Sequence, residues 1–199
     1  MQDEMSERDL KERLVLIESM IAEGRRSTEH WGWTFVLWGV AYYAAMAWSA
    51  WGPKSGLAWP ATMIVATILT VLIAKSRTHP HTESTVGRGI WAGWAAMGIS
   101  IFLLLGCLGF SGRLEVHGFV AIAAAMLGTA NATSSLILRW KLQFACAVVW
   151  WATVVAACFG SDTVMMSVFV GAIFICQIVF GVYGMIAESR KLKSTAVHA

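Results

Sequence analysis

The clearest deficiency of this 199-residue sequence is in charged side chains, which make up only 14% of it. Six stretches contain no Asp, Glu, Lys or Arg, and each is 20 to 25 residues long. A helix of roughly 20 apolar residues crosses a bilayer, whereas barrel strands are shorter and alternate in polarity. The deficiency excludes a soluble domain and predicts an all-α, polytopic membrane bundle over 31–187, with six transmembrane helices at about 31–51, 57–74, 89–108, 116–138, 142–159 and 163–187.

Acidic and basic side chains are also missing from inside the predicted spans, apart from His117 near one end of the fourth. Such groups mark proton relays, ion coupling and voltage sensing, so a coupled pump is disfavoured. The sequence lacks a Walker loop, a Gly-x-Ser-x-Gly elbow and a Cys-x-x-Cys pair. We therefore expect a protein that is not an enzyme and that binds no cofactor or metal. The four cysteines all fall in spans. Free thiols are favoured, and the alternative is a disulfide between Cys107 and Cys158, which both lie near outer helix ends.

The few basic residues are placed unevenly about the spans. Of the 15 Lys and Arg residues, 13 fall before the first span, after the sixth, or in the connections between spans two and three and between four and five. Only Lys54 and Arg113 belong to the other side. By the positive-inside rule both termini are cytoplasmic, including a short tail over 188–199. The basic residues thus reflect membrane topology, and no nucleic-acid partner is indicated.

Residues 1–30 differ from the rest because they contain eight acidic residues, which is unlike a signal peptide. Within them, apolar residues recur at the spacing of an amphipathic helix, at Leu10, Leu14, Ile17 and Ile21. Such a stripe lies on the membrane surface or packs on protein. An acidic polar face is repelled by anionic lipid, which favours packing of residues 6–23 on protein, either a second copy or the Lys75–Arg88 loop.

Small residues line one side of the fourth predicted span, where Ala124, Gly128 and Ala132 recur at intervals of four. Such a ridge lets helix backbones approach closely in a membrane. We therefore expect the fourth span to lie at the centre of the bundle. The sixth span has a narrower seam, predicted to lie on one face, at Ser167, Phe174, Gln177, Gly181, Gly184 and Glu188.

Polar residues inside the spans are few, and they share faces with the small ones. The candidates for a pore lining or a packing contact are Asn131, Ser135 and Gln177, with Gly128, Gly181 and Gly184. A polar substrate site is one interpretation. Interhelical hydrogen bonding that holds the bundle together is the other, and it is favoured.

Eleven tryptophans are present, and eight of them fit the belts that aromatic residues form at membrane interfaces. Trp38, Trp150 and Trp151 do not fit. Together with Tyr42, which shares a helix face with Trp38, they are candidates for an aromatic cavity that binds an apolar or cationic ligand. Ordinary packing is the alternative, and we favour it.

The segment from Glu18 to Arg26, continued by the apolar run from Trp33 to Gly39, supports one comparison. It resembles uncharacterised bacterial inner-membrane proteins that have a short amphipathic N-terminal helix followed by several spans. The resemblance implies a bacterial origin and a place in the inner, cytoplasmic membrane. It implies no activity.

Two functions fit these observations. The first is a non-enzymatic membrane protein of interaction or regulatory type, either a homo-oligomer or a subunit of a larger membrane complex. The alternative is an uncoupled channel or facilitator for a small neutral or cationic solute, lined by Asn131, Gln177 and nearby small residues.

Overall fold

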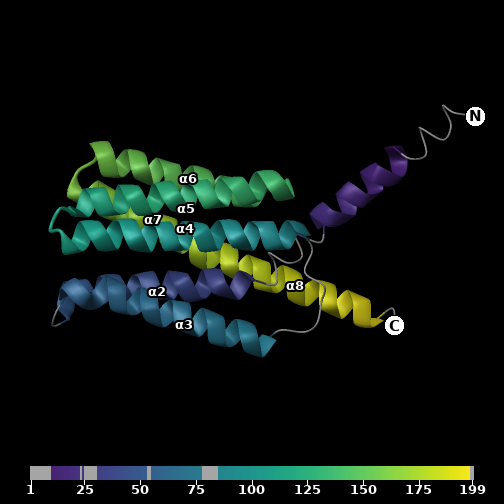
Figure 1. The fold of residues 1–199 in the computed structure, drawn as a ribbon, viewed down its shortest axis with the longest axis horizontal. Helices are drawn as coiled ribbons and strands as arrows, with labels where there is room; N and C mark the ends of the chain where they lie inside the picture. The colour runs from purple at the N-terminus through teal and green to yellow at the C-terminus, as the bar shows by residue number, and fades with distance from the viewer. Residues whose placement is uncertain (1–9, 23, 25–30, 53–54, 78–84, 198–199) are drawn as a thin grey trace, which may run out of the picture.

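The regular structure of the chain is helical throughout the part that the computed structural model describes, residues 10–22, 24, 31–52, 55–77 and 85–197 (Figure 1). A helix over residues 10–22 comes first. After it come α2 (Gly32–Trp51), η1 (Ser55–Leu57), α3 (Ala58–Arg77), α4 (Thr85–Phe110), α5 (Val116–Leu138), α6 (Lys141–Phe159), α7 (Asp162–Ile173), η2 (Phe174–Val179) and α8 (Phe180–Val197).

Five stretches of the described chain are long and apolar enough to cross a membrane: Ala58–Ser76, Val86–Phe110, Val116–Leu138, Lys141–Phe159 and Asp162–Arg190. The chain is therefore a helical membrane protein, as the sequence predicted. The helix α2, which covers the first predicted span, is 20 residues long but is not among the five. It contains four tryptophans and two tyrosines, whose polar tips lower its hydropathy.

From α2 onward the helices lie side by side and alternate in direction along one axis, with α7, η2 and α8 running on as one long helix (Figure 1). The connections after α2, α4 and α6 gather at one end of the bundle. The helix over residues 10–22, the α5–α6 connection and the C-terminal end of α8 lie at the other end. This second end carries Arg139 and Lys141 at the α5–α6 connection and Arg190 towards the end of α8.

The helix α5 is the most enclosed of the five candidate spans, as expected from its small residues. Half of the residues in the most apolar 18-residue stretch of α5 are buried, whereas none of those in the corresponding stretch of α4 are. Its ridge of Ala124, Gly128 and Ala132 is buried, chiefly against α6. A Cβ atom added at Gly128 would lie 2.6 Å from Cδ1 of Trp151 and 3.3 Å from Cβ of Trp150. Only glycine lets the two helices approach this closely.

A tight connection keeps α5 and α6 together. Arg139 ends α5 in the left-handed conformation, with φ 49° and ψ 41°, and the backbone N–H of Trp140 donates to the carbonyl of Ser135 at 2.9 Å. Lys141 then begins α6. Because only two residues separate the helices, they must run antiparallel and in contact along their lengths.

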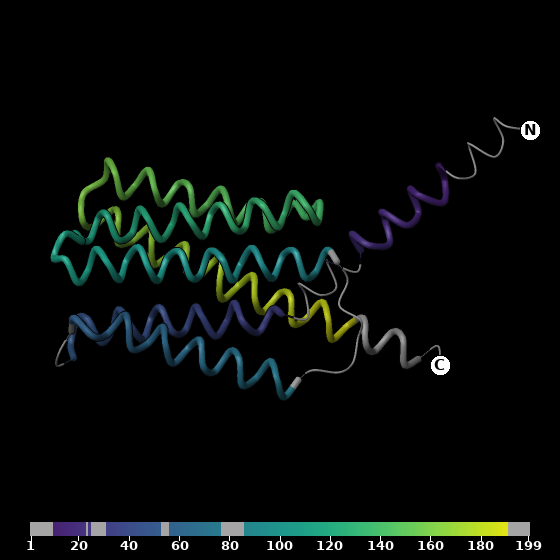
Figure 2. The backbone as a smooth tube through the Cα atoms, in the orientation of Figure 1, coloured from purple at the N-terminus to yellow at the C-terminus, as the bar shows by residue number. Residues whose placement is uncertain are grey.

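The sixth predicted span is one long helix, which can be followed without a break in Figure 2. Its middle segment, η2, is a π-helix. A π turn takes more residues than an α turn, so it rotates the buried face. On the α7 side the buried residues are Met165, Phe169, Ala172 and Ile173, while Ser167 and Phe174 are exposed. The predicted seam was therefore wrong at Ser167 and Phe174. It was right at Gln177, Gly181 and Gly184, which are buried.

The segment η2 marks where this long helix changes neighbours. The α7 half packs on α6 and α5, whereas η2 and α8 pack on α2. At the α2–α8 contact, a Cβ atom added at Gly32 would lie 2.8 Å from the carbonyl oxygen of Gly181, and the converse distance is also 2.8 Å. Backbone therefore meets backbone, and the C-terminal helix joins the α2–α3 pair to the α5–α6 pair.

We predict that Gly128→Ala lowers the free energy of unfolding by about 1–3 kcal/mol, because the new methyl group overlaps the Trp151 indole. Thermal unfolding of the detergent-solubilised protein measures the change. Gly118→Ala in the same helix is the matched control, since a Cβ atom there meets nothing within 4 Å. Equal effects of the two substitutions would show that the α5–α6 contact does not depend on glycine.

Candidate interaction surface and polar core

The helix over residues 10–22 presents its apolar stripe to the outside. The side chains of Leu10 and Leu14 are each 58% exposed and that of Ile17 is 51% exposed, while Ile21 is half-buried. The helix projects from the end of the bundle as a separate arm (Figure 1). The described part of the chain therefore leaves the predicted partner-binding stripe largely uncovered. The middle of the Lys75–Arg88 loop, the other predicted contact, lies outside the described residues.

Gly24 lies where this arm meets the bundle formed by α2 to α8, which we call the membrane body. It is buried, and a Cβ atom added to it would lie 2.9 Å from Cδ2 of Leu138 at the end of α5 and 2.9 Å from Cγ1 of Val86 at the start of α4. The arm thus leaves the bundle at a fixed point between two helix ends.

The predicted polar residues of the spans are buried. Asn131 and Ser135 each donate a hydrogen bond to a carbonyl group of their own helix. Asn131 Nδ2 donates to the Leu127 carbonyl at 2.9 Å, and Ser135 Oγ donates to the Ala132 carbonyl at 2.7 Å. Gln177 lies in η2, where its Cβ would be 2.9 Å from a Cβ atom added at Gly39 of α2. The structure places Asn131 and Ser135 on one helix and Gln177 on another.

A further buried amide, Gln143, was missed by sequence analysis. Its side chain is fully buried at the start of α6, and neither its Nε2 nor its Oε1 has a hydrogen-bond partner among the described residues. The Oδ1 atom of Asn131 and the Nε1 atom of Trp150 are unpartnered in the same way. The burial of Gln143 could not be predicted from the sequence, because a polar residue two positions after Lys141 is expected at the membrane interface. No periodicity signals that it points inward.

The cysteines are free thiols, as predicted. Cys107 and Cys158 are exposed, and Cys146 and Cys176 are buried. The thiol of Cys176 in η2 donates to the carbonyl of Cys146 in α6 at 3.5 Å. This weak bond is a direct polar link between the π segment and α6.

The four candidate aromatic residues belong to different clusters. Trp38 and Tyr42 are neighbours, with ring centroids 6.2 Å apart, and they continue through Trp59 to Phe119 of α5. Trp150 is buried against Phe169, at 6.2 Å, and Trp151 is partly exposed beside Phe144, at 6.4 Å. Among the described residues no ring contact joins the first pair to the second, so the structure does not assemble all four around one space.

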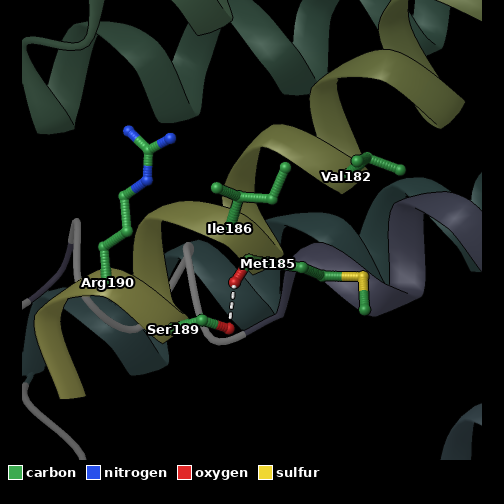
Figure 3. Close-up of a pocket in the computed structure, with 5 residues that line it drawn as sticks. All are labelled: Val182, Met185, Ile186, Ser189 and Arg190. Carbon is green, nitrogen blue, oxygen red and sulfur yellow. Dashed lines mark hydrogen bonds between the residues drawn. The ribbon is translucent and has the colours of Figure 1, made fainter. Parts of the chain in front are cut away.

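Two of the hollows in the described structure lie elsewhere. One, of about 440 Å³, lies along α8 and is lined by Val182, Met185, Ile186, Ser189 and Arg190 (Figure 3). The hydroxyl of Ser189 is turned to the carbonyl of Met185, to which it donates at 2.9 Å. The other, of about 250 Å³, lies between α4 and α5, where Trp94 Nε1 donates to Ser134 Oγ at 2.9 Å. Neither is lined by Asn131, Gln143 or Gln177.

At the end of the bundle away from the arm, His117 of α5 contacts α6 and α7. The sequence did not predict this arrangement of His117. Its Nδ1 atom lies 2.7 Å from the Ala157 carbonyl at the end of α6, and its Nε2 atom lies 2.8 Å from Asp162 Oδ1 at the start of α7. Both neighbours are acceptors, so the imidazolium form, with two N–H donors, satisfies both. Within the described residues, no group of three or more His, Cys, Asp or Glu side chains is arranged to hold a metal ion.

Comparison with known proteins finds no match to any family model, to any curated protein or to any solved structure.

We predict that Gln143→Met raises the free energy of unfolding by about 1–3 kcal/mol, because it replaces two unpartnered buried polar atoms with an apolar chain of similar size. Thermal unfolding in detergent measures the change. Gln143→Asn is the control, since it keeps the amide and leaves a small gap. A clear loss of stability in the Met variant would mean that the amide has a hydrogen-bonding partner in the membrane.

Proposed function

We propose that this chain is a non-enzymatic, six-span protein of the bacterial inner membrane that binds a protein partner through the helix over residues 10–22. The observation that carries the proposal is the exposure of the apolar stripe at Leu10, Leu14 and Ile17. Enclosing Leu14 and Ile17 fully would contribute roughly 1.5–3 kcal/mol each. That is enough for a useful contact when the arm is attached to a membrane body.

The charge of the N-terminal segment supports a protein partner over the lipid surface. Residues 1–30 contain eight acidic and five basic residues. Helices that lie on membranes usually have a basic polar face that meets anionic headgroups. The acidic excess here opposes that arrangement, whereas a protein surface can supply both apolar contact and opposite charge.

The position of the arm also supports an interaction role. At the opposite end of the bundle the helices are joined by short connections, and Gly160 and Ser161 alone separate α6 from α7. A partner therefore has more chain to contact at the end that carries the arm. We infer that this end is cytoplasmic, because it holds most of the basic residues.

The facilitator remains the second candidate because of one observation, the unpartnered buried amide of Gln143 at the start of α6. Unpartnered polar atoms at membrane depth are expensive and often mark a pathway. Against it, Asn131, Gln143 and Gln177 are each at most 2% exposed, so packed side chains close the core in this conformation. Uptake of small neutral solutes into proteoliposomes, with Gln143→Met as the variant, tests this candidate.

The six-span topology requires that α2 crosses the membrane although its hydropathy is low. Two features support a crossing. The helix has the length of a span, and it packs on α3 and on the membrane-spanning helix formed by α7, η2 and α8. Its aromatic residues suit a helix whose ends lie at the two interfaces.

We predict that Ser19→Cys and Ser55→Cys, each made in a chain whose four native cysteines are alanine, react with a membrane-impermeant maleimide from opposite sides of the membrane. Ser194→Cys should react from the same side as Ser19→Cys. Labelling of intact cells and of inverted vesicles measures the difference. If positions 19 and 55 were labelled from one side, α2 would not cross and the protein would have five spans.

We predict that the double substitution Leu14→Asp, Ile17→Asp removes partner binding while the protein still inserts in the membrane at a normal level, because only the exposed stripe becomes charged. Chemical cross-linking in membranes followed by gel analysis measures binding. Val15→Asp, Ser19→Asp is the matched control, since it adds the same charge to the other side of the same helix. Unchanged cross-linked species in the first variant would refute the interaction role.

A further inference from the structure

The apolar residues of the arm have the spacing of a coiled-coil seam. Leu10, Leu14, Ile17 and Ile21 are separated by 4, 3 and 4 residues, which is the alternation of d and a positions in a heptad. Three of the four side chains are more than half exposed. The opposite side of the helix carries Glu12 and Ser19, one heptad apart at the outermost f position. The stripe is therefore shaped to meet another helix along its length.

The attachment of the arm restricts which helices it can meet. Gly24 is held between Val86 and Leu138 at one end of the bundle. Copies of the chain in one membrane share one orientation, so their arms leave the membrane in the same direction. Two such arms side by side run parallel and in register. Confinement to the membrane also raises their effective concentration, so a helix too short to pair in water can pair here.

The charges beside the seam suit this parallel pairing. In the heptad register set by the seam, Arg13 is at a g position and Glu18 is at the following e position. In a parallel pair, a g side chain meets the e side chain five residues further along the other helix. Arg13 of each copy therefore faces Glu18 of the other, and both flanking contacts are attractive.

We infer that the partner of the arm is a second copy of this chain, and that residues 10–22 of the two copies pair in parallel through Leu10, Leu14, Ile17 and Ile21. This inference rests on the proposed function and names its partner. The contact buries the exposed stripe symmetrically and brings Arg13 of each copy beside Glu18 of the other. It makes the protein a homo-oligomer whose cytoplasmic arms are joined.

Disulfide cross-linking tests the pairing in native membranes. Leu14→Cys and Ile17→Cys are each made in a chain with Cys107→Ala and Cys158→Ala, which removes the exposed native thiols. In a parallel pair each new thiol meets its own counterpart, so mild oxidation should give covalent dimers. Ser19→Cys, on the far side of the same helix, is the matched control and should give at least about tenfold less dimer. Equal cross-linking at all three positions would overturn the inference.

Charge exchange tests the register. Arg13→Glu and Glu18→Arg should each lower the yield of Leu14→Cys dimers about twofold to fivefold, because like charges then face each other. The double variant Arg13→Glu, Glu18→Arg restores both attractive contacts and should recover the original yield. An additive loss in the double variant would overturn the parallel register, because an antiparallel pair places position 18 opposite Lys11.

The two proposals fail in different ways. If Leu14→Asp, Ile17→Asp removes a cross-linked partner that is a different protein, while no cysteine position gives dimers of this chain, the interaction role stands and the second copy is refuted. If the double aspartate variant changes nothing and the cysteine positions give no dimers, both proposals fall.

Discussion

The close approach of helix backbones is the constraint on which the rest of this structure depends. Within a bilayer the hydrophobic effect does not drive helices together, since lipid tails are as apolar as the side chains. Cohesion must come from packing and from a few hydrogen bonds. At Gly128 the indole of Trp151 occupies the space where a side chain would be, and at Gly32 and Gly181 two backbones touch directly. Elsewhere the packing is looser. The glycines at 89, 93, 98 and 106 of α4 have nothing within 4 Å of an added Cβ, and α4 is the least enclosed span.

These two glycine contacts are connected by the long C-terminal helix. Its α7 half belongs to the α5–α6 side of the bundle and its α8 half to the α2–α3 side. The change of neighbour needs a rotation of the buried face, which the π turns of η2 supply. Cys176 and Gln177 sit in those turns and are buried against α6 and α2. The π segment is therefore part of how the bundle holds together, and its polar side chains are placed by that requirement.

The membrane body and the arm differ in which side chains they bury and which they expose. The body buries its amides and, in the described residues, shows no metal-binding group of acidic, histidine and cysteine side chains. The arm does the opposite and exposes large apolar side chains at a fixed exit point beside Val86 and Leu138. Apolar surface that the described part of its own chain leaves uncovered is a common property of interaction sites. For this reason the proposed function lies in the arm, with the body as its anchor.

Composition and periodicity were enough to predict the helical membrane class and the enclosed face of α5 with Gly128 and Asn131, because uncharged runs of 20 residues or more can only be buried or in lipid. Three other features depended on tertiary structure. The π turns shifted the buried face away from Ser167 and Phe174, because the helix changes neighbours in its middle. Gln143 turned inward at a helix start, and His117 met Asp162 across 45 residues of chain. None of these is visible in a local pattern, because each depends on which helix lies opposite, and that is set by the packing of the whole bundle.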